Sequence, residues 1–191
     1  MSLRLHYYIS LRPLRLRVFA LNTTLDHSNN MQDIIKPVLI FTWGNPSRGD
    51  DALGTEAYDL LQKEDLEDVD VLTDFQLQIE HTVDLENRAR ILFIDASISA
   101  TAPFEFYHLK SAQDDSFTTH AMSPESLLAT YEKVNKTAPP PAFMLSIRGY
   151  EFGLGLTMSD KASANLAAAL DFIHQLLSKN NTDDWNLLAK S

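Results

Sequence analysis

The chain has 191 residues, 45% hydrophobic and 22% charged, which predicts one globular domain with its own core. A formal net charge of -10 argues against general nucleic-acid binding, which needs a basic surface. The absence of cysteine excludes disulfides, thiolate catalysis and thiolate metal sites. No apolar run reaches the ~20 residues that a transmembrane helix needs, so we expect a soluble, cytoplasmic protein.

The first 30 residues differ in composition from the rest, with four arginines and one acid: Arg4, Arg12, Arg15, Arg17 and Asp26. An organellar targeting peptide is one interpretation, but no convincing amphipathic period supports it. The simpler one is that the natural chain begins at Met31. We expect residues 1–30 to be disordered or non-native, residues 31–180 to form an α/β domain, and residues 181–191 to form a polar tail.

Strands and helices alternate from residue 37 onward. In chain order we expect a strand at 37–43, a helix at 52–63, a strand at 69–75, a helix at 80–87 and strands at 90–94 and 104–109. A helix at 123–134, a strand at 142–147 and a helix from 159 onward follow. The continuous apolar runs at 37–43 and 90–94 are typical of strands buried on both faces. This alternation predicts an α/β fold, a single three-layer domain whose mostly parallel, twisted sheet is sandwiched between helices.

The turn after the first strand is the most informative segment, because Asp50 and Asp51 follow a run of Gly, Asn and Pro. A purely structural turn has no evident use for a tandem acid pair, so we interpret the pair as functional. A phosphate cradle is disfavoured, since the glycine spacing matches no phosphate-binding motif and the acids would repel phosphate. No G-x-S-x-G segment supports a catalytic serine.

Three ionisable residues fall just beyond the expected carboxyl ends of strands or near a helix start: Asp51, Asp95 and His120. Two carboxylates and an imidazole suit a divalent metal such as nickel or zinc, with positions left open for substrate. Each has a structural alternative, as a helix cap, a first-turn acid or a surface histidine. The segment 76–81, which ends in Glu80 and His81, either lines the same site or forms a cap with an exposed histidine.

Three segments of the chain carry a family resemblance: Gly44-Asn45-Pro46-Ser47-Arg48-Gly49-Asp50-Asp51-Ala52-Leu53-Gly54, Phe93-Ile94-Asp95-Ala96, and Thr119-His120-Ala121-Met122-Ser123-Pro124-Glu125-Ser126-Leu127-Leu128. They resemble the [NiFe] hydrogenase maturation endopeptidases, the proteases that process the hydrogenase large subunit. The resemblance extends over roughly residues 37–178, and Ala52 stands where the family often has glycine. Gln76-Leu77 with Glu80, and the segment from Phe152 to Ser159, look like the branch that processes soluble, bidirectional or cytoplasmic-type hydrogenases.

The resemblance implies an enzyme of phosphorylase/hydrolase-like α/β fold that removes a C-terminal extension from the nickel-loaded large-subunit precursor. It carries the family's metal-contacting acid–acid–His set onto Asp51, Asp95 and His120. Nickel would arrive with the substrate, so we expect no permanent cofactor, and we expect a monomer. The competing interpretations are a non-catalytic nickel-binding or metallochaperone module in hydrogenase assembly, and a hydrolase acting on a small molecule.

Overall fold

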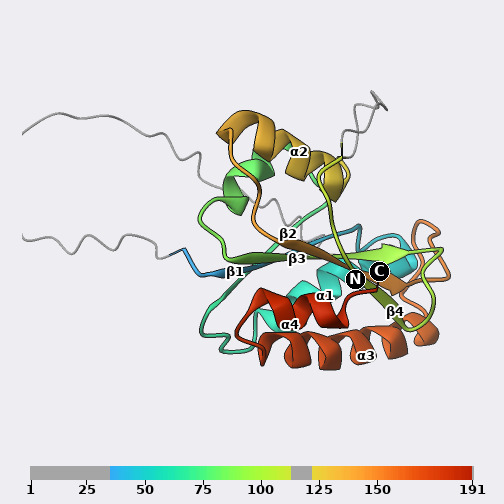
Figure 1. Cartoon of the computed structure of the whole chain (residues 1–191). Coiled ribbons are helices and arrows are strands. Elements are labelled where there is room, and N and C mark those ends of the chain that lie inside the picture. Colours follow the sequence, from blue (N-terminus) through green and yellow to red (C-terminus); the bar gives the residue numbers. More distant parts are fainter. Residues whose placement is uncertain (1–34, 113–121, 191) are drawn as a thin grey trace, which may run out of the picture. The chain divides into compact units, whose positions relative to one another are not determined.

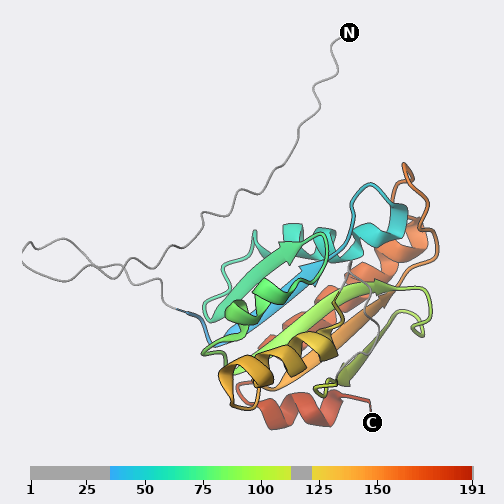
Figure 2. The same ribbon diagram turned by 90° about the horizontal axis from the view of Figure 1, so that it is seen from above.

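The structure, a computed structural model, describes residues 35–112 and 122–190. They contain a five-stranded sheet with the strand order β2-β1-β3-β5-β4 (Figures 1 and 2). Four strands are mutually parallel: β1 (Val38–Trp43), β2 (Val69–Asp74), β3 (Arg90–Ser97) and β5 (Ala142–Arg148). The edge strand β4 (Phe104–His108) pairs antiparallel with β5. The predicted α/β fold with a mostly parallel sheet is confirmed.

Helices cover both faces of this sheet, and Figure 1 shows α2 on one side and α3 and α4 on the other. One face packs against α1 (Leu53–Leu61), α3 (Asp160–Leu177) and α4 (Thr182–Leu188). The other packs against the 3-10 helix η2 (Ile79–Leu85) and against α2 (Pro124–Asn135). β1 and β3 are buried on both faces, as their continuous apolar runs predicted. Within the described residues, no helix is long and apolar enough to cross a membrane.

The helices expected from 123 and from 159 onward are confirmed, and each begins after a serine cap. The Ser123 hydroxyl oxygen accepts a hydrogen bond from the Ser126 N–H, and that of Ser159 accepts one from the Ala162 N–H, each at 3.2 Å. Most expected boundaries lie within two residues of the observed ones, and two elements depart further. The short helix predicted at 80–87 is the 3-10 helix η2, and β3 continues to Ser97, two residues beyond Asp95.

The prediction of a polar tail at 181–191 is wrong for most of that segment, because residues 182–188 form α4. Its Trp185 is fully buried and donates its indole N–H to the Leu176 carbonyl at 2.8 Å. The Arg90 guanidinium lies 5.1 Å from the Trp185 ring and donates to the carbonyls of Lys179 and Asn180. Trp185 is thus the buried anchor of this segment, and the Lys190 N–H adds a hydrogen bond to the Phe106 carbonyl of β4 at 2.8 Å. The segment 1–30 lies outside the described residues, and its interpretation stays a prediction.

We expect Trp185→Phe to lower the free energy of unfolding by about 2 kcal/mol. The smaller ring gives up the hydrogen bond to Leu176 and leaves space beside Phe106 and Phe143, whose rings now contact the indole. Urea denaturation of the wild type and the variant measures this difference. A change smaller than about 0.5 kcal/mol would mean that α4 contributes little to the fold.

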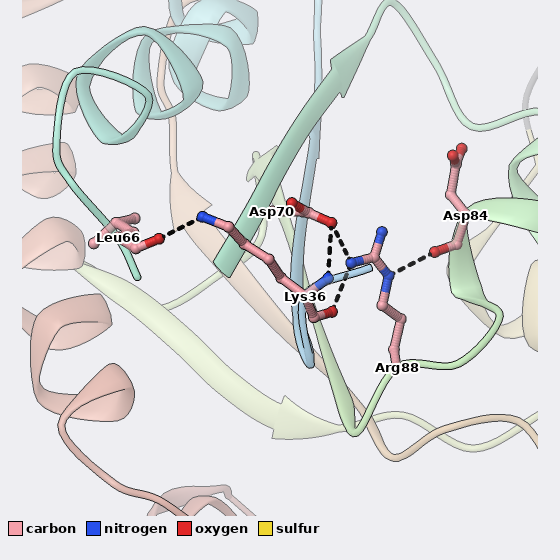
Figure 3. A network of polar contacts seen from close by, with 5 residues as sticks. All are labelled: Lys36, Leu66, Asp70, Asp84 and Arg88. Atoms are coloured by element: carbon pink, nitrogen blue, oxygen red, sulfur yellow. Dashed lines mark hydrogen bonds and ion pairs between the residues drawn. The ribbon is translucent and has the colours of Figure 1, made fainter. Parts of the chain in front are cut away.

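At the amino ends of β1 and β2, a polar network joins three segments of the chain (Figure 3). Arg88 pairs with Asp70 and donates to the carbonyls of Lys36 (2.7 Å) and Asp84 (3.1 Å). The Lys36 ammonium donates to the Leu66 carbonyl at 2.8 Å. All of these contacts lie at the amino edge of the sheet, so they stabilise the end opposite to the one where the candidate site lies.

Candidate active site

Asp51 is positioned by the turn between β1 and the 3-10 helix η1 (Gly49–Ala52). Gly44 and Gly49 have positive φ values of 147° and 59°, which favour glycine. A Cβ at Gly44 would also collide with the Asp51 carbonyl, and one at Gly49 with the Glu151 carbonyl. The Asn45 N–H donates to the Asp51 carboxylate at 3.2 Å. The turn thus holds a half-buried carboxylate just beyond the carboxyl end of β1.

Asp50, the other member of the acid pair, has a structural role. Its side chain is fully buried and accepts hydrogen bonds from the N–H groups of Tyr150 (2.7 Å), Glu151 (3.0 Å) and Ser159 (2.7 Å), and from the Ser159 hydroxyl (3.0 Å). Burial alone would raise the pKa of Asp50, but these bonds outweigh it and hold that pKa below its usual value. Our interpretation of the tandem acids as jointly functional was therefore wrong for Asp50.

The loop of residues 149–159 joins β5 to α3 and lies beside the turn that follows β1 (Figure 2). The Gly155 N–H donates to the Ser47 carbonyl at 2.7 Å, and the Gly49 N–H donates to the Leu156 carbonyl at 3.1 Å. The Gly149 N–H in turn donates to the Ser97 carbonyl at the end of β3. Because parallel strands end at the same edge, connections following three strands meet around Asp51 there.

Asp95 lies on β3, the strand next to β1, as a partly buried carboxylate. One of its oxygens accepts the Ala96 N–H at 2.7 Å, and the Trp43 side chain also bonds to the carboxylate. Burial raises the pKa of Asp95 to about 7, and the negative charge of Asp51 adds to the rise, whereas the two hydrogen bonds oppose it. Asp51 and Asp95 are thus close enough to interact electrostatically, and Asp95 titrates near neutral pH.

His120, the third predicted site residue, lies outside the described residues. Within residues 35–112 and 122–190, no group of three or more His, Cys, Asp or Glu side chains is arranged to hold a metal ion. The acid–acid–His set therefore remains a prediction, of which the structure describes the two acids.

A carboxylate that the sequence analysis missed, Asp74, ends β2 at this same edge and is the register partner of Trp43. One of its oxygens lies 3.3 Å from Nε2 of His81, whose Nδ1 accepts the Gln78 N–H at 2.9 Å. Since Nδ1 is an acceptor, Nε2 carries the proton and donates to Asp74. His81 is 2% exposed and packs on Phe41, so it is a cap residue but not an exposed one.

The position of Asp74 repeats that of Asp95, since each acid follows apolar residues near the end of a strand. This equivalent position at a strand end was the sequence signal that could have identified Asp74. Across β2, β1 and β3, the carboxyl edge presents Asp74, Trp43 and Asp95 in neighbouring strands, with Asp51 in the turn beyond β1. These carboxylates lie at the carboxyl edge of a parallel sheet, where open α/β folds commonly bind their ligands and where a carboxylate can transfer a proton.

The particular fold is that of the [NiFe] hydrogenase maturation proteases. The HycI protease from Thermococcus kodakarensis KOD1 superposes with a TM-score of 0.60 at 17% identity, covering 75% of this chain and 94% of its own. The hydrogenase maturating endopeptidase HybD from E. coli superposes with a TM-score of 0.58 at 18% identity, covering 74% of this chain and 91% of its own. The hydrogenase 2 maturation peptidase from Thaumarchaeota archaeon SCGC_AB-539-E09 has a TM-score of 0.55 at 22% identity, covering 75% of this chain and 99% of its own. No protein-family model and no curated protein matches the sequence.

Proposed function

We propose that this protein is an endopeptidase that removes the C-terminal extension of a nickel-loaded [NiFe] hydrogenase large-subunit precursor. The observation that carries the proposal is the electrostatic interaction of Asp51 and Asp95 at the carboxyl edge, on the fold shared with [NiFe] hydrogenase maturation proteases. The three segments that resemble the family support it from the sequence. The partner would be the precursor protein alone, without a nucleic acid or a membrane, and the enzyme would act in the cytoplasm as a monomer.

In this proposal nickel is part of the substrate, and the protein recognises it by offering Asp51, Asp95 and His120 as ligands. Carboxylate oxygens and an imidazole nitrogen are suitable donors for such a divalent ion. Docking of the metal would fix the scissile peptide beside the two acids, and this placement would supply much of the rate enhancement. A carboxylate beside the docked metal would assist proton transfer at the scissile peptide. No permanent cofactor is required.

The test is the intact mass of a nickel-loaded large-subunit precursor before and after incubation with the protein. We expect loss of a short C-terminal peptide with the wild type, and no loss with Asp51→Asn or with His120→Ala. Asp59→Asn, which makes the same acid-to-amide change on the exposed side of α1, is the matched control and should process normally.

Nickel-free precursor should keep its mass, because the metal is the proposed recognition element. If the nickel-loaded precursor also keeps its mass with the wild type, the peptidase proposal fails. A metallochaperone would instead transfer nickel stoichiometrically while leaving the partner's mass unchanged, and metal analysis of the separated proteins distinguishes this outcome.

A further inference from the structure

The 149–159 loop exposes apolar side chains next to the candidate site. Leu154 is 79% exposed, Leu156 46% and Tyr150 40%. Glu151 is the loop's only charged residue, in a chain that carries 26 acids and a net charge of -10. A surface segment with one charge and several exposed apolar side chains, on an acidic protein, is poorly explained by solubility and is typical of a site for another macromolecule.

The loop is held at both ends by the carboxylate that precedes Asp51 in the chain. Asp50 accepts hydrogen bonds from Tyr150 and Glu151 at the start of the loop and from Ser159 at its end. The bond from the Gly49 N–H to the Leu156 carbonyl adds a contact within the loop. Leu154 and Leu156 are therefore presented at a fixed place relative to Asp51, which lowers the entropic cost of binding a partner there.

A second group of exposed apolar residues lies on the β2 side of the same edge. Phe75, which directly follows β2, is 63% exposed, and Ile79 and Val83 on η2 are 59% and 65% exposed. The strand order places β1 and β3, with their acids, between β2 and β5. Apolar groups thus follow the strands on either side of the carboxylates.

We propose that the 149–159 loop, together with Phe75 across the edge, docks the polypeptide substrate by binding apolar side chains on either side of the cleaved bond. The occupant is a protein segment that combines apolar side chains with a cationic centre, because the surface combines apolar rims with a carboxylate pair between them. This inference rests on the proposed function, whose substrate is such a polypeptide, and adds where and how that substrate is held.

Leu154→Asp tests the inference, since a side chain that is 79% exposed can be replaced without removing core packing. Leu187→Asp is the matched control: the same substitution at an 83% exposed leucine, on α4, which packs beside β4. With nickel-loaded precursor as substrate, we expect Leu154→Asp to raise KM about tenfold and to leave kcat nearly unchanged. With nickel-free precursor, calorimetry should give a Kd about tenfold weaker for Leu154→Asp and unaltered for Leu187→Asp.

The outcomes separate this inference from the proposed function. If the wild type cleaves the precursor and Leu154→Asp does so with unaltered KM and Kd, the docking inference is overturned and the peptidase stands. If the wild type does not cleave, the proposed function fails, and the calorimetric comparison still decides whether the loop docks the polypeptide. A loop that instead joins two copies of this chain would change the gel-filtration mass in Leu154→Asp without changing Kd, which also overturns the inference.

Discussion

Asp50→Ala is expected to destabilise the folded protein by roughly 3–5 kcal/mol, enough to threaten folding of an average domain. The substitution removes a fully buried carboxylate that accepts four hydrogen bonds, and it leaves three backbone N–H groups and the Ser159 hydroxyl without that partner. Asp50→Asn should also be costly, because its amide nitrogen would replace one of the two accepting oxygens and face N–H donors.

Urea denaturation of Asp50→Ala beside Asp51→Asn measures the contrast between the two adjacent acids. Asp51 accepts one described hydrogen bond, from Asn45, so its amide variant should lose far less stability. Because the pKa of Asp50 is lowered in the folded state, its contribution is present above the ordinary aspartate pKa and lost as the pH falls through the folded value. A loss in Asp50→Ala below about 1 kcal/mol would contradict the assigned structural role.

Asp95→Asn is expected to have the opposite effect and to stabilise the protein at pH 8, by at most roughly 4 kcal/mol. The pKa of Asp95 is about 7 in the folded state against 3.8 for the ordinary side chain. Between these values the folded protein keeps a proton that the unfolded chain releases, so stability falls as the pH rises through this window. Asparagine is neutral at every pH and can still accept the Ala96 N–H, so it removes this cost.

The measurement is the free energy of unfolding of wild type and Asp95→Asn at pH 4 and pH 8. At pH 4 the wild-type carboxyl is largely protonated in the folded state and the two proteins should be nearly equal. Asp51→Asn is an informative companion, because removing its charge should lower the pKa of Asp95 and recover part of the gain at pH 8. A difference of equal size at both pH values would show that the buried charge is not its cause.

The sheet and its covering helices followed from the sequence because the signals were local. The apolar runs of β1 and β3 and the caps at Ser123 and Ser159 each lie within a few residues of the element that they define. α4 was missed for the converse reason. Its residues are mostly polar, and the burial of Trp185 against Arg90 and the rings of β4 and β5 involves residues far away in sequence.

The candidate site was predictable in part for similar reasons. Asp95 follows an apolar strand, and Asp51 follows a turn whose glycines are required by its backbone, so both could be placed at the carboxyl edge. The sequence could not tell which acid of the tandem pair points inward, because the partners of Asp50 lie about 100 residues further along the chain. Asp74 was overlooked although its position repeats that of Asp95, and the burial of His81 depends on Phe41 of another strand.

The hydrogen bonds between Asp50 and Ser159 have a consequence for folding during synthesis on the ribosome. The carboxylate is made early, whereas its last partner is synthesised 109 residues later. Until Ser159 has emerged, the charge of Asp50 has no complete set of donors in which to be buried, and the turn that carries Asp51 lacks the loop that supports it. A nascent chain therefore contains Asp51 and Asp95 long before the candidate site has its finished arrangement, which can form only after Ser159 has been synthesised.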